Sequence, residues 1–366
     1  MLTQEMASNI VEQTMIRLNR NINIMNDKGM IIASGDQNRL YQLHFGAMEV
    51  LKTGKPLIID QNNQRHWEGS LPGINLPIKF QERIIGVIGI TGVPEEIMEF
   101  GELVKMITEM MIQQSFIAEQ LEWKQRLKEQ VFEELLKDYI QEESIKQRLN
   151  LIDIKIVPPF QVAVIETAQN PLKRSEFLQL LEGIFNEKHA LAGFLNVNRI
   201  FLLFINQLEA TVKQKLINVL NQLRAKNIAV RIGLGSTVMG ETQVRHSYLE
   251  ALKALQFGNI EQELISFTEI ETKALLDGLD ERAKRQYQNR ILGKLSDKLI
   301  ETLDHFFKCN QNIGECAKTM YIHRNSLIYR LKKIRELTGL DPQKLNDAVA
   351  LQLAVWLWQL EKKDTI

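Results

Sequence analysis

The most constraining feature of this sequence is a long stretch, Glu102 to Val157, that contains neither glycine nor proline. Its apolar residues keep helical spacing from Leu103 to Tyr139, over more turns than an ordinary globular helix has. Pro94 is well placed as the first residue of such a helix. The stretch predicts one or two connecting helices that associate with a second chain as a coiled coil. The alternative is two helices packed on their own domain.

The segment before this helix predicts a small α+β sensing domain over residues 1–120. An amphipathic helix at 5–20 precedes short β-like runs, and the turn at 27–29 predicts a hairpin of residues 22–25 with 30–33. Residues 76–80 and 84–90 predict a second hairpin. Strands mixed with short helices indicate a central antiparallel sheet.

The segment after it predicts a helical linker at 121–157, an α/β domain at 158–270 and an all-helical domain at 296–362. In the α/β domain, β-rich runs alternate with helical segments. The predicted strands are 160–166, 199–205 and 228–234, and the predicted helices are 174–187, 209–225 and 241–256. A chain of 366 residues with 45% hydrophobic residues has enough apolar surface for two or three such cores.

Composition excludes several classes of protein. Lys plus Arg and Asp plus Glu both number 45, so net charge indicates no partner. Two cysteines exclude a disulfide scaffold and a four-cysteine zinc site. No secretory signal and no membrane-length apolar run is present. We therefore expect a cytoplasmic protein with no metal and no cofactor.

A helix-turn-helix is predicted near the C-terminus. Asn312 and Glu315 form a capping box that starts a short helix at 313–320. A tight turn at 321–322 leads to a longer helix at 324–337, which Gly339 ends. Between Lys318 and Arg335 the chain carries six cations and no acid, which is typical of a phosphate-binding surface. The predicted DNA-binding residues are Lys318, His323, Arg324, Asn325, Ser326, Tyr329, Arg330 and Lys333. The alternative is a solvated basic face on a structural bundle.

Segments at both ends of the chain resemble two known families of domains. Residues 325–331 and 338–340 resemble the PucR-type helix-turn-helix of bacterial regulators, and 73–78 with 86–92 resemble the sugar diacid recognition domain. Together, in this order and length, they are similar to the carbohydrate diacid regulator family. The resemblance implies a PAS-like sensor, a degenerate GGDEF-like middle domain and a homo-oligomer on operator DNA. It also implies an activator of genes for uptake or catabolism of the acid that it senses.

A diacid carries two carboxylates, so its site needs cationic or N–H donors at both ends and hydroxyl partners between them. The residues expected to bind it are Ser34, Arg39, His44, Asn75, Thr91 and Gly92. The alternatives are surface contacts for Arg39 and His44, and turn-shaping roles for Asn75 and Gly92. Tyr41 and Phe45 replace a glycine and an acidic residue of the family pattern. These aromatic rings predict a smaller or re-aimed pocket and a smaller acid such as glycerate.

The sequence of the middle domain predicts that this domain has no catalytic activity. A cyclase needs carboxylates for metal and a Gly-rich turn for phosphates, and the corresponding hairpin at 191–198 lacks the GGDEF signature. No nucleophile elbow, P-loop or Rossmann fingerprint is present either. We therefore expect a ligand-responsive DNA-binding regulator and no enzyme. The second hypothesis is a nucleotide-binding or enzymatic protein that uses the middle domain.

Overall fold

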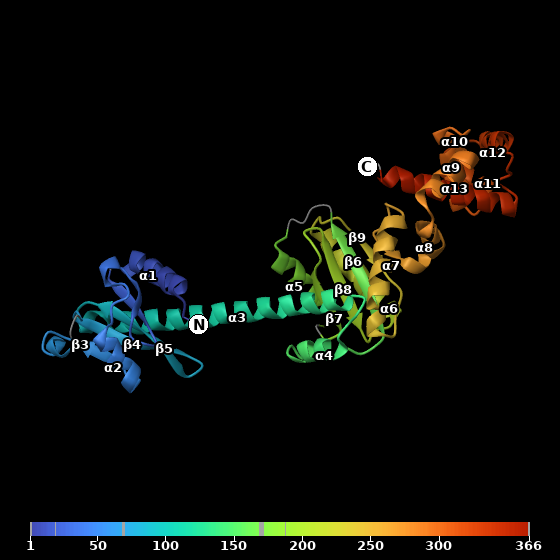
Figure 1. The fold of residues 1–366 in the computed structure, drawn as a ribbon. Coiled ribbons are helices and arrows are strands. Elements are labelled where there is room, and N and C mark those ends of the chain that lie inside the picture. The colour runs from blue at the N-terminus through green and yellow to red at the C-terminus, as the bar shows by residue number, and fades with distance from the viewer. Residues whose placement is uncertain (1, 19, 68–69, 168–171, 187, 365–366) are drawn as a thin grey trace. The chain divides into compact units, whose positions relative to one another are not determined.

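The computed structural model describes residues 2–18, 20–67, 70–167, 172–186 and 188–364. It confirms an α+β multidomain chain with two sheets and a helical C-terminal region (Figure 1). The chain divides into two compact units, residues 1–125 and 126–366. No helix of the described residues is both long and apolar enough to cross a membrane.

The first unit contains the predicted antiparallel sheet, with strand order β2-β1-β5-β4-β3. Both predicted hairpins are confirmed. Its elements are α1 (Gln4–Leu18), β1 (Ile22–Asn26), β2 (Ile31–Ser34), α2 (Phe45–Thr53), β3 (Leu57–Ile59), β4 (Gly73–Phe80) and β5 (Arg83–Thr91). Short 3₁₀ turns at Gln37–Arg39 and Gln64–His66 connect them.

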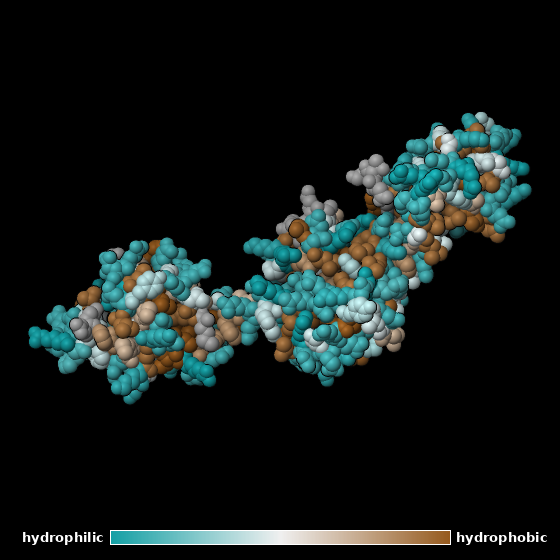
Figure 2. Space-filling view, in the orientation of Figure 1, coloured by the Kyte–Doolittle hydropathy of each residue, from teal (hydrophilic) through white to brown (hydrophobic). Residues whose placement is uncertain are grey.

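Alternate strand residues face opposite sides of this sheet, as the pleat requires. On one side, Ile24, Ile74 and Ile88 pack with α1 and with the first half of α3 (Pro94–Leu135). On the other side, Met25 and Val87 pack with α2. Hydrophobic side chains also reach the visible surface of this unit between hydrophilic ones (Figure 2).

The segment predicted as a helical linker at 121–157 is helical at the end of α3 and again at 142–150. The last turns of α3 bury Leu127, Val131, Phe132 and Leu135 in the core of the second unit, and α4 (Glu142–Asn150) packs there too. The Phe132 ring stacks on Phe201 with centroids 3.8 Å apart. The predicted helical spacing is present here, and its apolar residues pack in the core of the middle domain, which is the alternative that the sequence leaves open.

The middle domain has a mixed sheet of order β10-β9-β6-β8-β7, and among its described strands only β10 and β9 pair in parallel. Its elements are β6 (Phe160–Thr167), α5 (Arg174–Ile184), β7 (Ala190–Phe194), β8 (Arg199–Ile205), α6 (Glu209–Ala225), β9 (Val230–Leu234), α7 (Val244–Phe257) and β10 (Leu264–Ser266). Helices α5 and α6 cover one face, while α7 and the end of α3 cover the other.

The C-terminal region is helical, as predicted. It comprises α8 (Phe267–Ala274), α9 (Glu281–Leu292), α10 (Asp297–Lys308), α11 (Ile313–Thr319), α12 (Arg324–Thr338) and α13 (Leu345–Asp364). One apolar core joins α9 to α13. Hydrophilic residues dominate its visible surface (Figure 2).

Replacement of Phe132 tests whether the end of α3 belongs to the middle-domain core. Phe132→Ala removes a fully buried ring, so we expect the free energy of unfolding to fall by about 3–5 kcal/mol. Tyr139→Ala is the control, because Tyr139 is 92% exposed. Denaturant unfolding of the full chain measures both, and equal effects would contradict this assignment.

Candidate effector site and nucleic-acid interface

A row of polar side chains crosses the sheet of the first unit. Strand pairing places Ser34 opposite Asn23, Asn23 opposite Gly89, and Gly89 opposite Asn75. The Ser34 hydroxyl donates to Asn23 Oδ1 at 2.6 Å. A Cβ on Gly89 would lie 2.9 Å from Asn75 Oδ1, so the missing side chain leaves room for this amide. Ser34 and Asn75 thus lie in one row, as a common site requires.

The first turn of α2 lies against the same row. His44 is the N-cap residue of α2, and its Nδ1 accepts a hydrogen bond from the Ala47 amide at 3.1 Å. A Cβ on Gly46 would lie 3.2 Å from His44 Cε1 and 3.4 Å from Asn75 Nδ2. The structure therefore brings His44 and Asn75 together across Gly46.

His44 is neutral at physiological pH. Burial, together with the nearby charge of Arg39, lowers the pKa of His44 from 6.5 to about 4. Because Nδ1 accepts a hydrogen bond, the neutral ring carries its proton on Nε2 and can donate from there. Protonation of Nδ1 would break the helix cap.

Arg39, His44, Asn75 and Ser34 form a cluster. Together with the first turn of α2, it offers both a hydrogen-bond acceptor for a hydroxyl group and donors for a carboxylate, as a hydroxy acid needs. Asn75 is 3% exposed and its Oδ1 is buried with no hydrogen-bond partner among the described residues. Helix first-turn amides have no intrahelical partner, and those of Phe45 and Gly46 have none elsewhere in the described chain. Unpaired amides at a helix N-terminus favour an anion.

Thr91 and Gly92 lie outside this cluster. Thr91 follows Gly89 by two residues on β5, but the Thr91 amide donates to the Asn21 carbonyl. The Gly92 amide donates to the Pro72 carbonyl. Both amides are therefore already used, and neither is offered to an anion as the sequence analysis expected.

The two aromatic residues that depart from the family pattern are not buried. Tyr41 is 61% exposed and Phe45 is 44% exposed. The Tyr41 hydroxyl accepts a hydrogen bond from Gln4 of α1 at 2.7 Å.

Helices α11 and α12 form the predicted helix-turn-helix. Asn312 accepts from the Glu315 amide and caps α11, while His323 Nδ1 accepts from the Asn325 amide at 3.2 Å and caps α12. Gly339 ends α12 with φ +75°, a conformation that glycine adopts without strain. Leu327, Leu331 and Ile334 form the buried face of α12, as predicted.

Seven of the eight predicted DNA-binding side chains are exposed. They are Lys318, His323, Arg324, Asn325, Ser326, Tyr329 and Lys333. Arg330 is half-buried and donates to Thr302 of α10 at 3.2 Å, so it also holds α12 in place. Within the described chain, Lys318, Arg324 and Lys333 form no ion pair, which leaves their charges available to phosphates.

A groove of about 500 Å³ runs beside α12 and is lined by Asn325, Ser326, Tyr329 and Lys333. Lys298, from the first turn of α10, lines it as well. Lys298 lies outside the acid-free run and so was not predicted, because only the packing of α10 on α12 brings it to this groove.

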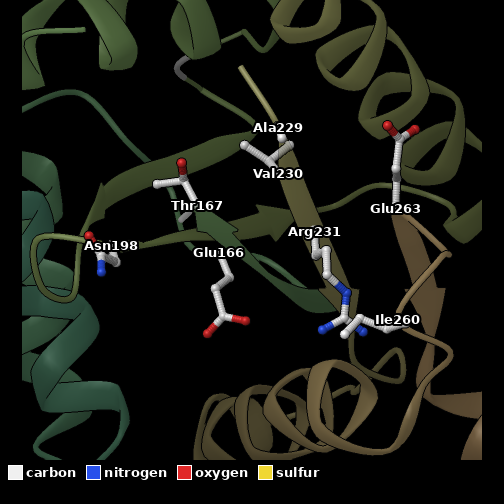
Figure 3. A pocket seen from close by; sticks show the side chains of 8 residues that line it. All are labelled: Glu166, Thr167, Asn198, Ala229, Val230, Arg231, Ile260 and Glu263. Atoms are coloured by element: carbon white, nitrogen blue, oxygen red, sulfur yellow. The ribbon is translucent and has the colours of Figure 1, made fainter. Parts of the chain in front are cut away.

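A pocket of about 530 Å³ opens at one end of the middle-domain sheet (Figure 3). Its carboxylates are already neutralised: Glu166 pairs with Arg199 at 2.7 Å, and Glu263 pairs with Arg224. In Figure 3 these two lining carboxylates point in opposite directions. In the described part of the chain, no group of three His, Cys, Asp or Glu residues could hold a metal ion. The pocket offers no pair of free carboxylates for metal-assisted chemistry.

Comparison with known proteins decides the family. Family models match residues 2–135 (sugar diacid recognition), 137–257 (GGDEF-like domain) and 299–357 (PucR C-terminal helix-turn-helix domain). The chain is 30% identical to the carbohydrate diacid regulator of Escherichia coli K12, over 97% of this chain and 98% of that protein. The chain belongs to the carbohydrate diacid regulator family. It is also 26% identical to the DNA-binding transcriptional activator AdeR of Bacillus subtilis, over 60% of this chain and 57% of that one. As a member of this family, the present chain is a transcription regulator with a helix-turn-helix domain.

The low pKa of His44 predicts a pH dependence of stability. Its pKa is 6.5 when unfolded and about 4 when folded, so the unfolded chain takes up the proton first as pH falls. The free energy of unfolding should therefore decrease between pH 6.5 and 4, by a total on the order of 3 kcal/mol. His44→Asn keeps a capping oxygen and removes the titration.

Denaturant unfolding between pH 7 and pH 4 measures this effect. The His44→Asn variant should lose less stability over that range than the natural chain. His66→Asn, at an exposed histidine of the same unit, should follow the natural chain. Identical profiles for all three proteins would show that His44 does not titrate in this way.

Proposed function

We propose that this regulator binds a carbohydrate diacid, or a related hydroxy acid such as glycerate, at the cluster formed by Arg39, His44, Asn75 and Ser34. Binding changes its affinity for operator DNA, on which it acts as a homodimer in the cytoplasm. It activates genes for uptake or catabolism of the acid. The observation that carries the proposal is the buried Oδ1 of Asn75, which has no partner among the described residues and lies beside the first turn of α2.

The chemistry of the cluster assigns a place to each part of the ligand. A carboxylate accepts hydrogen bonds from the first-turn amides of α2 and from His44 Nε2, with the charge of Arg39 nearby. A hydroxyl group donates to Asn75 Oδ1, which replaces its lost contact with water. Ser34 supplies a hydroxyl for the far end of a longer diacid, and Thr91 and Gly92 stay at the periphery.

Strand β4 connects this site to helix α3, so a change at the site on ligand binding would reach the rest of the chain through β4. Asn75 faces the site, whereas its neighbours Ile74 and Leu76 face α3 on the other side of the sheet. A Cβ on Gly101 of α3 would lie only 2.1 Å from Ile74 Cδ1. Helix α3 therefore lies directly behind the effector site, and a shift of β4 on binding moves the helix.

The proposed DNA contact follows from the exposed first turn of α12. Such N-terminal residues of a recognition helix reach base edges in the major groove, while neighbouring cations bind phosphates. We assign base contacts to Arg324, Asn325 and Ser326, and phosphate contacts to Lys318 and Lys333. We propose no catalytic role for the middle domain, because its pocket carboxylates are paired with arginines.

Loss of the Asn75 amide should weaken effector binding without loss of fold. Asn75→Leu has nearly the same shape and removes an unsatisfied buried oxygen, so stability should stay equal or rise. A lost hydrogen bond of roughly 1–3 kcal/mol should weaken binding about 5- to 150-fold. Thermal-shift titration of the full chain with galactarate, glucarate and glycerate measures both effects.

The control for this titration is Asn62→Leu, at an exposed asparagine of the same unit. It should bind the acids as the natural chain does. Unchanged binding by Asn75→Leu would exclude the site. No shift of the natural chain with any of these acids would exclude the proposed class of effector.

Loss of the Arg324 guanidinium should weaken operator binding. We expect Arg324→Ala to cost roughly 1–3 kcal/mol on a site selected from random duplexes, and to relax its sequence preference. Fluorescence anisotropy at fixed salt gives the affinities, since salt changes every phosphate contact. Arg65→Ala, at an exposed arginine of the first unit, should leave them unchanged. Equal affinities for both variants would exclude this recognition helix.

A further inference from the structure

Helix α3 has two apolar faces within the first unit. One face is buried on the sheet and contains Ile97, Gly101, Val104 and Ile112. The other is exposed and contains Phe100, Leu103, Ile107, Met110, Ile117 and Leu121, whose exposed fractions lie between 43% and 62%. These six residues, together with Gln114, are called the seam. Large apolar side chains gathered in this way mark an interaction surface.

The seam follows a heptad pattern. Its positions are 100, 103, 107, 110, 114, 117 and 121, separated by alternating steps of three and four residues. This is the a/d spacing of a coiled coil, maintained over a length of about 32 Å at 1.5 Å per residue. All seven residues are helical and none belongs to the buried face.

We propose that the seam binds the same seam of a second copy of this chain, as a parallel two-stranded coiled coil. A two-fold axis places each seam position opposite its own copy, so one heptad face is self-complementary. The flanking positions between 106 and 120 carry no charge. They are Met106, Met111, Gln113, Ala118 and Gln120. Two identical helices therefore meet without repulsion along their flanks.

Gln114 selects the parallel, in-register arrangement. At an a position it lies opposite Gln114 of the second copy only when the helices are parallel and in register, where the two amides can pair. In an antiparallel pair, a positions face d positions, and Gln114 would lie among apolar side chains with its amide unpaired. A single polar residue at an a position is a known determinant of register.

This dimer serves the proposed function, because two joined chains present two helix-turn-helix domains to a two-fold operator. The same helix carries Gly101 on its buried face, behind Asn75. The seam therefore belongs to the helix that a shift of β4 would move. Dimerisation is measured without DNA or effector, so its failure and the failure of the proposed function are distinguishable.

The first experiment measures the molar mass of the full chain by light scattering on a sizing column. The natural chain should be a dimer, and Leu103→Glu/Ile117→Glu should be a monomer with an unchanged circular dichroism spectrum, since both side chains are half-exposed already. Ile16→Glu is the matched control, because Ile16 is a 73% exposed apolar residue of α1, and it should stay dimeric. A monomeric natural chain, or a dimeric double variant, would overturn the proposal.

The second experiment tests orientation by oxidative cross-linking in a Cys309→Ser/Cys316→Ala background. Gln114→Cys should give a covalent dimer, because two a positions of parallel helices face each other. Glu119→Cys, on the outer face of the same helix, should give none. A dimer that fails to cross-link at position 114 would overturn the parallel register.

Discussion

The contact between α3 and β4 is the one on which the rest of the structure depends. Gly101 lets the helix approach so closely that any larger residue would meet Ile74. This one contact completes the core of the first unit, fixes which face of α3 stays exposed, and places the helix behind Asn75, on the opposite face of β4. The same helix ends in the core of the second unit.

In the proposed effector site, specificity would come from buried polar groups that the described part of the folded chain leaves incompletely paired. An amide oxygen without a partner costs free energy in the absence of ligand, and in our proposal a ligand at Asn75 and Gly46 offsets that cost. His44 contributes in two ways, as the cap that orders the first turn of α2 and as a neutral donor. A protonated His44 could not cap the helix, so its low pKa belongs to the architecture of the site.

Much of this could be predicted from the sequence, because strand alternation, hairpin turns and helix caps are local. The hairpins, the capped α11, the buried face of α12 and the helical nature of α3 all follow from spacing and turn residues. Periodicity alone could not say which apolar positions of α3 pack inside the chain and which stay exposed, since both faces keep helical spacing. That division depends on the sheets, which form from distant segments.

In the candidate sites, too, contacts between distant segments could not be predicted from the sequence. Ser34 and Asn75 could be chosen for their chemistry, but their alignment through Gly89 is a matter of strand register. The amides of Thr91 and Gly92 looked available in sequence and are used by carbonyls from other segments. Lys298 joins the groove beside α12 only through the packing of α10 on α12.

The central claim is that acid binding and operator binding are coupled in one chain. The most direct test is to titrate galactarate or glycerate into the full chain, by calorimetry, with and without saturating operator duplex. Linkage requires the DNA to change the affinity for the acid by the same factor as the acid changes the affinity for DNA, typically 5- to 150-fold. We expect equal factors within that range. An acid that binds equally tightly in the presence and absence of DNA would contradict the account.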